Sequence, residues 1–487
     1  VLRNDLYLLG ISCYKEGLYE EAIKYLKQVK QTPADSIAEN TCLHLGHSYL
    51  RVNDIEKAKL SYSAAIAFGL DHALREEAMY NYVQVTYLQN SALGESIHAF
   101  QTFIKEYPNS KYIDKVYALM ADMYVNSKNY QAALEALEEV QRPNDKIEQT
   151  KQYLRYQLAA DTYLQGKMGE TLKWCEQVIK NSNQSTDYQT ETYYLSAEAH
   201  YHLHQYDQVL SRLSAYEAQP NYAQSPNKIA AQYLKAYTHF NQKDYATAQR
   251  AYSAYVTMIN QGDKTYPDAL NRIGDCHFHS RQFEQAIQAY AQVATIGGTG
   301  ADYALLQKAY AEGLMHQYDQ KVKTLNKLID DYPKSDLADD ALYEMARAEL
   351  QMDEHSKAIT IYNKLLTEYP KSNKSAKSSL ELGMTHRTLK AYDEALKVFK
   401  QTIEKYPATE EAYSALDGIE QIYVETNNIS EYIAYTKTLS KMKMQAASSE
   451  DSLVYVTGEL QYMMGNYEQA AAGLATYLTR FCPDGRY

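Results

Sequence analysis

Residues 378–407, SSLELGMTHRTLKAYDEALKVFKQTIEKYP, are the clearest copy of a unit that recurs from end to end of the chain. The stretch predicts two helices joined by a short turn, with Leu382 and Gly383 in the first helix and Tyr392 opening the second. Pro407 then ends the unit, because proline fixes the backbone and removes an N–H donor that a helix needs. The number and regularity of these copies therefore decide the fold.

Three kinds of position recur in phase in thirteen copies. The first is a small residue of the first helix, repeated at spacings of 35 to 39 residues: Gly10, Gly46, Gln84, Ala121, Ala159, Ala197, Ala236, Gly274, Ala309, Ala346, Gly383, Glu420 and Gly458. The second follows twelve positions later: Ala22, Ala58, Ser96, Ala133, Thr171, Val209, Ala248, Ala286, Lys321, Ala358, Ala395, Tyr432 and Ala470. A larger apolar residue, such as Phe399, stands four positions beyond that in nearly every copy. Small residues let two helices approach to about 8–10 Å, so the pattern predicts tandem antiparallel helix pairs.

On these residues the chain resembles the tetratricopeptide repeat family, whose units carry a small residue in the first helix, Ala-x3-Phe in the second and a terminal proline. The resemblance covers essentially all 487 residues. It implies an all-α, right-handed superhelical solenoid of about thirteen antiparallel helix pairs. Lys321, Glu420 and Tyr432 depart from the pattern, so we expect the ninth and twelfth pairs to splay or shift.

The strongest candidate for a joint in the array is the glycine-rich run GGTG at residues 297–300, at the shortest repeat spacing. It predicts repeats one to eight in residues 1–296 and repeats nine to thirteen in residues 301–487, within one continuous solenoid. A second candidate is the proline-bearing loop at residues 219–227.

Charge and composition limit the function classes. The formal net charge of −12 argues against nucleic acid, whose binding draws on clustered Lys and Arg. No apolar run approaches the length of a transmembrane helix. Because the sequence begins at Val1 rather than Met, it is compatible with a targeting segment or a lipid anchor upstream of Val1.

Four repeat endings point to a narrower resemblance. These are EYPNS at 106–110, DYPKS at 331–335, EYPKS at 368–372 and KYPAT at 405–409. They are similar to the endings of bacterial cell-envelope members of the family, of the β-barrel assembly lipoprotein and Tol-Pal coordinator types. That similarity implies a periplasmic or outer-membrane-associated location, with the cytoplasm as the alternative. The endings also have a structural cause, since proline stops one helix and Ser or Thr can cap the next.

The sequence lacks the common signatures of catalysis. Neither a phosphate-binding Gly-Lys-Ser/Thr loop nor HExxH or GxSxG is present, so we expect no enzyme activity and no cofactor. His200 and His204 would share a helix face, but two ligands do not make a metal site. His200, His239 and His277 occupy equivalent positions in successive copies, which favours a packing role and no bound metal.

The family resemblance implies that the first helices line a concave surface that contacts partners. Transferring the family's contact positions to this sequence gives Tyr153, Tyr156, Tyr163, Tyr194, Glu198, Tyr201, His202, Tyr233, Tyr237, Phe240, Asp275 and Phe278. The family's carboxylate clamp is not expected, because Asp122, Glu198, Tyr237 and Asp275 stand where it needs Lys and Asn.

These residues predict an aromatic groove with acidic edges. Aromatic side chains dominate interface hot spots, so we interpret the groove as the binding site for a segment of a protein partner. Two alternatives stay open: an accessory binder of glycans or other small ligands in the same groove, and a groove that only reflects the 49 tyrosines of the chain.

Overall fold

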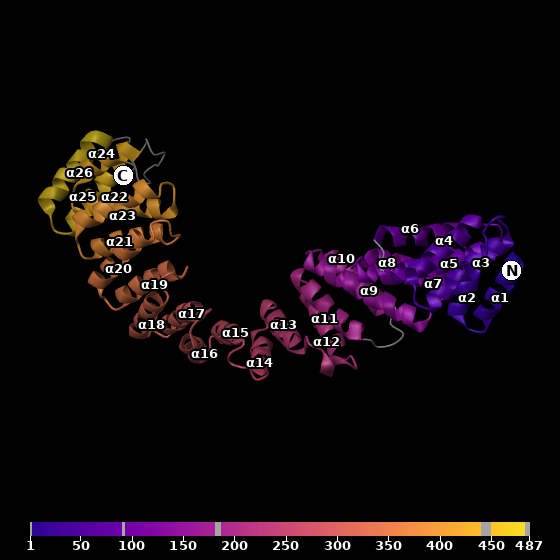
Figure 1. Cartoon of the computed structure of the whole chain (residues 1–487). Helices are drawn as coiled ribbons and strands as arrows, with labels where there is room; N and C mark the ends of the chain where they lie inside the picture. The colour runs from indigo at the N-terminus through magenta and orange to yellow at the C-terminus, as the bar shows by residue number, and fades with distance from the viewer. Residues whose placement is uncertain (1, 90–92, 181–186, 440–449, 483–487) are drawn as a thin grey trace. The chain divides into compact units, whose positions relative to one another are not determined.

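The computed structural model describes residues 2–89, 93–180, 187–439 and 450–482. Throughout these ranges the regular structure is helical, with 26 α-helices, one short 3-10 helix and no strand (Figure 1). The all-α array of helix pairs predicted from the repeat is confirmed. No helix in the described ranges combines the length and the apolar character that crossing a bilayer requires.

The chain divides into two units, Val1–Thr238 and His239–Tyr487. The helices of the first unit are α1 (Arg3–Lys15), α2 (Tyr19–Leu26), α3 (Ser36–Arg51), α4 (Ile55–Phe68), α5 (His72–Leu88), α6 (Leu93–Glu106), α7 (Ile113–Asn126), α8 (Tyr130–Glu138), α9 (Asp145–Leu164), α10 (Met168–Lys180), α11 (Asp187–His202), α12 (Tyr206–Glu217), η1 (Tyr222–Gln224) and α13 (Lys228–Asn241), whose last residues pass the boundary. Successive helices from α1 to α12 pack against one another.

The second unit repeats the same arrangement. Its helices are α14 (Tyr245–Val256), α15 (Tyr266–His279), α16 (Phe283–Ile296), α17 (Ala301–Leu314), α18 (Tyr318–Asp331), α19 (Ala338–Gln351), α20 (His355–Glu368), α21 (Ser375–Thr388), α22 (Tyr392–Lys405), α23 (Glu410–Glu425), α24 (Ile429–Leu439), α25 (Glu450–Met463) and α26 (Tyr467–Phe481). Helices α16 and α17, which flank residues 297–300, pack together, and Asn271 Nδ2 donates to the Gly300 carbonyl at 3.0 Å. The glycine run thus lies inside this unit, and the joint predicted there stays a prediction.

The small positions of the repeat are buried as predicted, but their neighbours differ from the expected ones. All thirteen second-helix positions are buried, as are the first-helix positions except Gln84 and Glu420. A Cβ placed on Gly383 would lie 2.4 Å from the ring of Phe399, and one on Gly46 would lie 2.5 Å from the ring of Tyr62. The first-helix glycine therefore makes room for the large residue sixteen positions later, and not for the second-helix alanine.

The turn between the two helices of a pair has the same backbone in twelve copies. The residue seven positions after the first-helix small residue has a positive φ at Asn53, Lys128, His204, Lys243, Arg281, His316, Asp353, Lys390 and Asn427, and at the glycines Gly17, Gly166 and Gly465. This left-handed conformation closes the first helix and turns the chain toward the second. Glycine adopts it without strain, whereas most other residues do not.

The two irregular pairs behave differently. Helices α23 and α24 of the twelfth pair pack less closely than most pairs, which agrees with the expected splay. Helices α17 and α18 of the ninth pair pack as closely as their neighbours, so the expectation of a splayed ninth pair is wrong. The reason is the local fit of Lys321, described below.

The Tyr-Pro endings tie successive repeats together. Ser335 Oγ donates to Asp302 Oδ2 at 2.6 Å and accepts from the Leu337 N–H at 3.1 Å. Ser372 Oγ makes the equivalent pair of bonds with Asp339 and with the Lys374 N–H. Thr409 caps α23 by accepting from the Ala412 N–H, so the predicted capping role is confirmed there.

Candidate functional site

Nine of the twelve predicted contact residues lie in the first unit, and a hydrogen-bonded cluster forms among them. Tyr163 OH of α9 donates to Glu198 Oε2 of α11 at 3.3 Å and lies 3.2 Å from His202 Nε2. Tyr194 OH donates to Glu198 Oε1 at 2.5 Å. Burial, and then the nearby charge of Glu198, raise the pKa of Tyr163 to about 12. The phenol groups are therefore engaged with Glu198, and the two rings also contact those of His202 and Tyr216.

The other five residues in this unit make ring contacts, mostly with aromatic side chains outside the predicted set. Tyr153 and Tyr156 both contact the ring of Tyr188, at centroid separations of 5.2 and 5.8 Å. Tyr201 lies 6.0 Å from Tyr206, and the rings of Tyr233 and Tyr237 meet edge to face at 5.0 Å. All five residues are partly buried.

The remaining three predicted residues lie in the second unit. Phe240 contacts the ring of Tyr245 at 5.6 Å and faces the guanidinium of Arg272. Asp275 is buried, and its carboxylate accepts from Tyr290 OH at 2.7 Å and from Tyr303 OH at 2.9 Å. Arg272 pairs with its other oxygen at 2.6 Å. Burial raises the pKa of Asp275, against the opposing effects of these partners. Asp275 thus joins two successive repeats instead of standing open at a groove edge.

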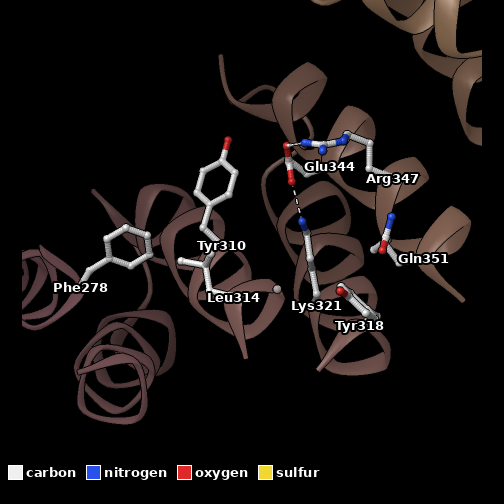
Figure 2. A pocket seen from close by; sticks show the side chains of 10 residues that line it. Phe278, Tyr310, Leu314, Tyr318, Lys321, Glu344, Arg347 and Gln351 are labelled. Carbon is white, nitrogen blue, oxygen red and sulfur yellow. Dashed lines mark hydrogen bonds and ion pairs between the residues drawn. The ribbon is translucent and has the colours of Figure 1, made fainter. Parts of the chain in front are cut away.

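Phe278, the third of these residues, lines a pocket of about 490 Å³ in the second unit (Figure 2). Helices α15 and α17 contribute Phe278, Tyr310, Gly313 and Leu314 to its lining. Helices α18 and α19 contribute Tyr318, Lys321, Glu344, Arg347, Ala348 and Gln351. A volume of this size is typical of pockets that hold a ligand or a partner side chain.

The pocket adjoins a departure from the repeat pattern, because the ninth repeat has a glycine where every other repeat has a side chain. Gly313 stands four positions after the small residue of its first helix. The equivalent residues elsewhere are Tyr14, Leu50, Leu88, Val125, Tyr163, Tyr201, Phe240, Phe278, Leu350, Arg387, Val424 and Tyr462. A Cβ on Gly313 would meet the side chain of Lys321, at 3.1 Å from Cδ and 3.2 Å from Nζ. Lys321 replaces alanine in the second helix, and the glycine accommodates its stem, so the helices of the ninth pair still pack closely.

A chain of three charges crosses one wall of the pocket (Figure 2). Lys321 Nζ lies 2.5 Å from Glu344 Oε2, and Arg347 Nη1 lies 3.3 Å from Glu344 Oε1. The Lys321 and Glu344 side chains are 9% and 12% exposed, whereas that of Arg347 is 52% exposed. One buried carboxylate therefore stands between two cations, and only the guanidinium reaches solvent.

The aromatic wall of the pocket is also influenced by these charges. Lys321 Nζ lies 6.0 Å from the centre of the Tyr310 ring, within cation–π range. Burial, followed by the nearby charge of Glu344, raises the pKa of Tyr310 to about 12. Tyr310 consequently stays neutral near pH 7 and offers its ring and a hydroxyl to a bound group.

Sequence reasoning found only Phe278 among the residues of this pocket. The transfer of contact positions stopped at the eighth repeat, and extending it to the ninth and tenth gives Tyr310, Gly313, Leu314, Arg347 and Gln351. The sequence does contain a signal for the pocket. In the ninth copy Gly313 stands where the other copies have a larger residue, and Lys321 stands where most copies have alanine.

A second pocket, of about 510 Å³, lies in the first unit between α5, α7 and α9. It also adjoins a departure from the repeat, because Gln84 stands at the small position and donates from Nε2 to Tyr80 OH at 2.9 Å. Each pocket thus lies beside a long polar side chain, Gln84 or Lys321, at a position where the repeat usually has a small residue. The pocket at Gly313 is distinguished by its almost buried ion pair.

The histidines take part in local contacts at the turns. His200 Nδ1 lies 2.7 Å from Gln205 Oε1, and His277 Nδ1 lies 2.7 Å from Gln282 Oε1. His239 faces Asp244, again five residues later, at 3.7 Å. In the parts of the chain that the structure describes, no three His, Cys, Asp or Glu side chains gather as metal ligands would.

Stacked antiparallel helix pairs with pockets on the first helices define a helical-repeat protein. Models of the tetratricopeptide repeat match residues 114–142, 233–301, 303–335, 340–372 and 377–409. The chain thus contains tetratricopeptide repeats, and the Gly313 pocket lies largely within the matches at 303–335 and 340–372. Each matching model describes a repeat and none an enzyme. No curated protein matches the chain.

Several solved repeat structures are similar at low identity. The C-terminal part of a TPR repeat-containing protein from Cytophaga hutchinsonii is 17% identical over 54% of this chain and 99% of its own, with a TM-score of 0.46. A tetratricopeptide repeat protein from Parabacteroides merdae is 15% identical over 53% of this chain and 94% of its own, with a TM-score of 0.34. The complex of Naa15 and Naa10 bound to HypK-THB is 14% identical over 98% of this chain and 76% of its own, with a TM-score of 0.40.

Proposed function

We propose that the protein is a non-catalytic scaffold that binds a segment of a partner protein, with the pocket at Gly313 as an anchor point. Tetratricopeptide repeats generally mediate protein–protein interactions. The observation that carries the proposal is the combination, in one 490 Å³ pocket, of apolar walls with a half-exposed guanidinium at Arg347. Buried aromatic or aliphatic anchors surrounded by polar groups are typical of interface hot spots.

The cluster of Tyr163, Tyr194 and Glu198 is proposed as a further contact region in the first unit. The bonds from both phenols to Glu198 fix the two rings. Rings that are already fixed lose little entropy when a partner covers them, so the cluster supports binding of a segment.

Site-specific photocross-linking tests the scaffold proposal. A photoreactive amino acid at position 314, where Leu314 is 54% exposed at the pocket, should cross-link a defined segment of one partner in the producing cells. The matched control is Leu60 of α4, which is 69% exposed and lies outside both pockets. Cross-links at position 314 that are no more numerous or specific than those at position 60 would contradict the proposal.

A glycan or small ligand is the second candidate, favoured by the proximity of aromatic rings and a carboxylate at Glu198. Sugars stack on aromatic faces and their hydroxyls donate to carboxylates. Calorimetry with soluble cell-wall fragments separates the candidates. Heat of binding that Tyr163→Ala and Tyr194→Ala abolish would establish the glycan function, and no heat together with a cross-linked protein segment would establish the scaffold.

A role in cell-envelope assembly depends on the resemblance of the Tyr-Pro endings. Their serines have structural tasks here, because Ser335 and Ser372 connect successive repeats. The proposal of an envelope role is therefore tested separately, by fractionating the producing cells and locating the full-length protein with an antibody. Recovery only in the cytoplasmic fraction would exclude it.

A further inference from the structure

We infer that the partner segment carries an arginine or lysine side chain that binds the carboxylate of Glu198, in the cluster that Glu198 forms with Tyr163 and Tyr194. This inference rests on the proposed scaffold function and specifies the charge of the segment that meets the first unit. A basic side chain is the occupant to which the charge and the contacts of this cluster point.

Carboxylates that accept hydrogen bonds from tyrosines recur in the chain, and two of them show what completes such a site. Asp275 accepts from two tyrosine hydroxyls and pairs with Arg272 at 2.6 Å. Glu425 accepts from Tyr392 OH at 3.1 Å and pairs with Arg387 at 2.6 Å. In both places one guanidinium balances the charge of a carboxylate that tyrosines already hold.

Glu198 has the tyrosines but not the cation. Two phenols donate to its oxygens, and among the residues that the structure describes no Lys, Arg or His forms an ion pair with it. The sequence gives the reason, because Leu195 stands three residues before Glu198. The residue three before Asp275 is Arg272, which supplies the cation there. A partner side chain can therefore take the role that Leu195 does not fill.

The basic groups in this part of the chain are engaged elsewhere. His202 Nε2 lies 3.2 Å from Tyr163 OH, and since that hydroxyl donates to Glu198, the ring nitrogen can donate its own hydrogen to the tyrosine oxygen. An imidazole makes this bond in its neutral form, so the bond does not balance the carboxylate charge. Lys235, on the following first helix, is bound to both oxygens of Glu217 at 3.0 and 3.1 Å.

The cluster is accessible to a partner and prepared for a cation. Tyr163, Tyr194 and Glu198 are partly exposed, and His202 is exposed. The two phenols hold the carboxylate in place, so a cation that binds it need not order this side chain first. At longer range the net charge of −12 attracts a basic segment and repels an acidic one.

The probe is a random-peptide display library selected on the full chain, followed by fluorescence anisotropy with the enriched synthetic peptides. We expect these peptides to contain Arg or Lys, and alanine in place of that residue should weaken binding by about tenfold or more. Glu198→Gln should weaken binding of the unchanged peptide by a similar factor and remove the effect of the alanine replacement, because the two changes break the same contact. Glu20→Gln, which neutralises an exposed glutamate of α2, should leave binding unchanged.

A second variant supplies the cation from the chain itself. Leu195→Arg places a guanidinium three residues before Glu198, and Arg272 pairs with its carboxylate at the same spacing. The new side chain should occupy Glu198 and weaken peptide binding by about tenfold or more, whereas the uncharged Leu195→Gln should retain most of it. Circular dichroism checks that the helices are retained. If Glu198→Gln loses helicity, the two Leu195 variants decide the question.

The outcomes separate the inference from the scaffold function. Enriched peptides without Arg or Lys, or peptides whose alanine replacement weakens binding to Glu198→Gln as much as to the natural sequence, would overturn the inference and leave the scaffold function in place. Equal binding to Leu195→Arg and Leu195→Gln would also overturn it. Failure to enrich any peptide, together with the absence of cross-links at position 314, would overturn the scaffold function itself. If only soluble cell-wall fragments bind, the glycan candidate replaces both.

Discussion

Lys321 of α18 and Glu344 of α19 form an almost buried ion pair of 2.5 Å that joins the second helix of the ninth repeat to the first helix of the tenth. The lysine occupies a position that is alanine in most repeats, so the pair is an addition to the repeat pattern. Charges withdrawn from water need their partner, and the loss of one member leaves the other unsatisfied. The pair therefore contributes to the interface between the two repeats as well as to the pocket.

Removal of Glu344 should weaken this interface more than removal of Lys321. Glu344→Ala leaves the Lys321 ammonium without its carboxylate, which we expect to cost about 1–3 kcal/mol. In Lys321→Ala the carboxylate keeps Arg347, and the double variant should be no less stable than Glu344→Ala alone, because it leaves no unpaired ammonium. Hydrogen exchange of α18 and α19 measures the effect, because stability in repeat arrays is local. Lys24→Ala, which breaks an exposed pair with Glu21, is the control, and equal protection in Glu344→Ala and this control would contradict the prediction.

The shared turn between paired helices makes a second prediction. Arg281 has a φ of +59°, a left-handed conformation that costs a non-glycine residue about 1–2 kcal/mol. Arg281→Gly removes this strain at some cost in chain entropy, and we expect a net gain of about 0.5–1 kcal/mol in the free energy of unfolding. Asn53→Gly should change little, since asparagine tolerates this backbone. Denaturant unfolding followed by circular dichroism compares the two, and an equal or smaller gain for Arg281→Gly would be evidence against the strain.

The helices could be predicted from the sequence because the same spacing of small and large apolar residues recurs in each repeat. Tyr392, expected to open the second helix of its pair, is the first residue of α22. The burial of the small positions followed from the same three registers. The residues that pack against these small positions could not be predicted, because the crossing of the helices decides which atoms fill the space above a glycine. Spacing alone does not show that Gly383 faces Phe399 and not Ala395.

The candidate site was harder to predict, since it depends on contacts between repeats. Asp275 was expected at the edge of a groove, but Tyr303, from the following repeat, reaches back to bond it. The glycine run at residues 297–300 was predicted as a joint within one continuous solenoid, and the contacts found there are a hydrogen bond from Asn271 to the Gly300 carbonyl and the packing of the flanking helices. Gly313 could have been found from the sequence, since it departs from twelve large residues at one position.

The close approach of Gly383 to Phe399 makes a third prediction. A Cβ at position 383 would lie 2.4 Å from the ring, and overpacking of this kind costs about 1–3 kcal/mol. Gly383→Ala should therefore lower the stability of the pair α21 and α22. Phe399→Leu should restore much of it in the double variant, because Ala121 and Leu137, and likewise Ala197 and Leu213, form this combination in other repeats. Thermal unfolding of the single and double variants tests the compensation, and additive losses in the double variant would show that the ring is not the obstacle.

The pairing of Arg3 with Asp35 makes the contact between α1 and α3 sensitive to acid. Arg3 donates to both oxygens of Asp35 at 2.7 Å, and Asp35 also caps α3 by accepting from the Ala38 N–H. The hydrogen bond from Arg3 and then that from Ala38 lower the pKa of Asp35 from 3.8 to about 2. Because the folded-state pKa is depressed, the stabilisation is fully present above the unfolded pKa and is lost as the pH falls through about 4 to about 2.

Hydrogen exchange across α1 and α3 should therefore rise over this range of pH in the natural sequence. Asp35→Asn has no carboxyl group to titrate, so it should show a weaker contact at neutral pH and a smaller change on acidification. The same steep loss of protection in both proteins would mean that another carboxyl group controls the acid response of these helices. Arg3→Gln should behave as Asp35→Asn at neutral pH, because the pKa of Asp35 is lowered first of all by the bond from Arg3.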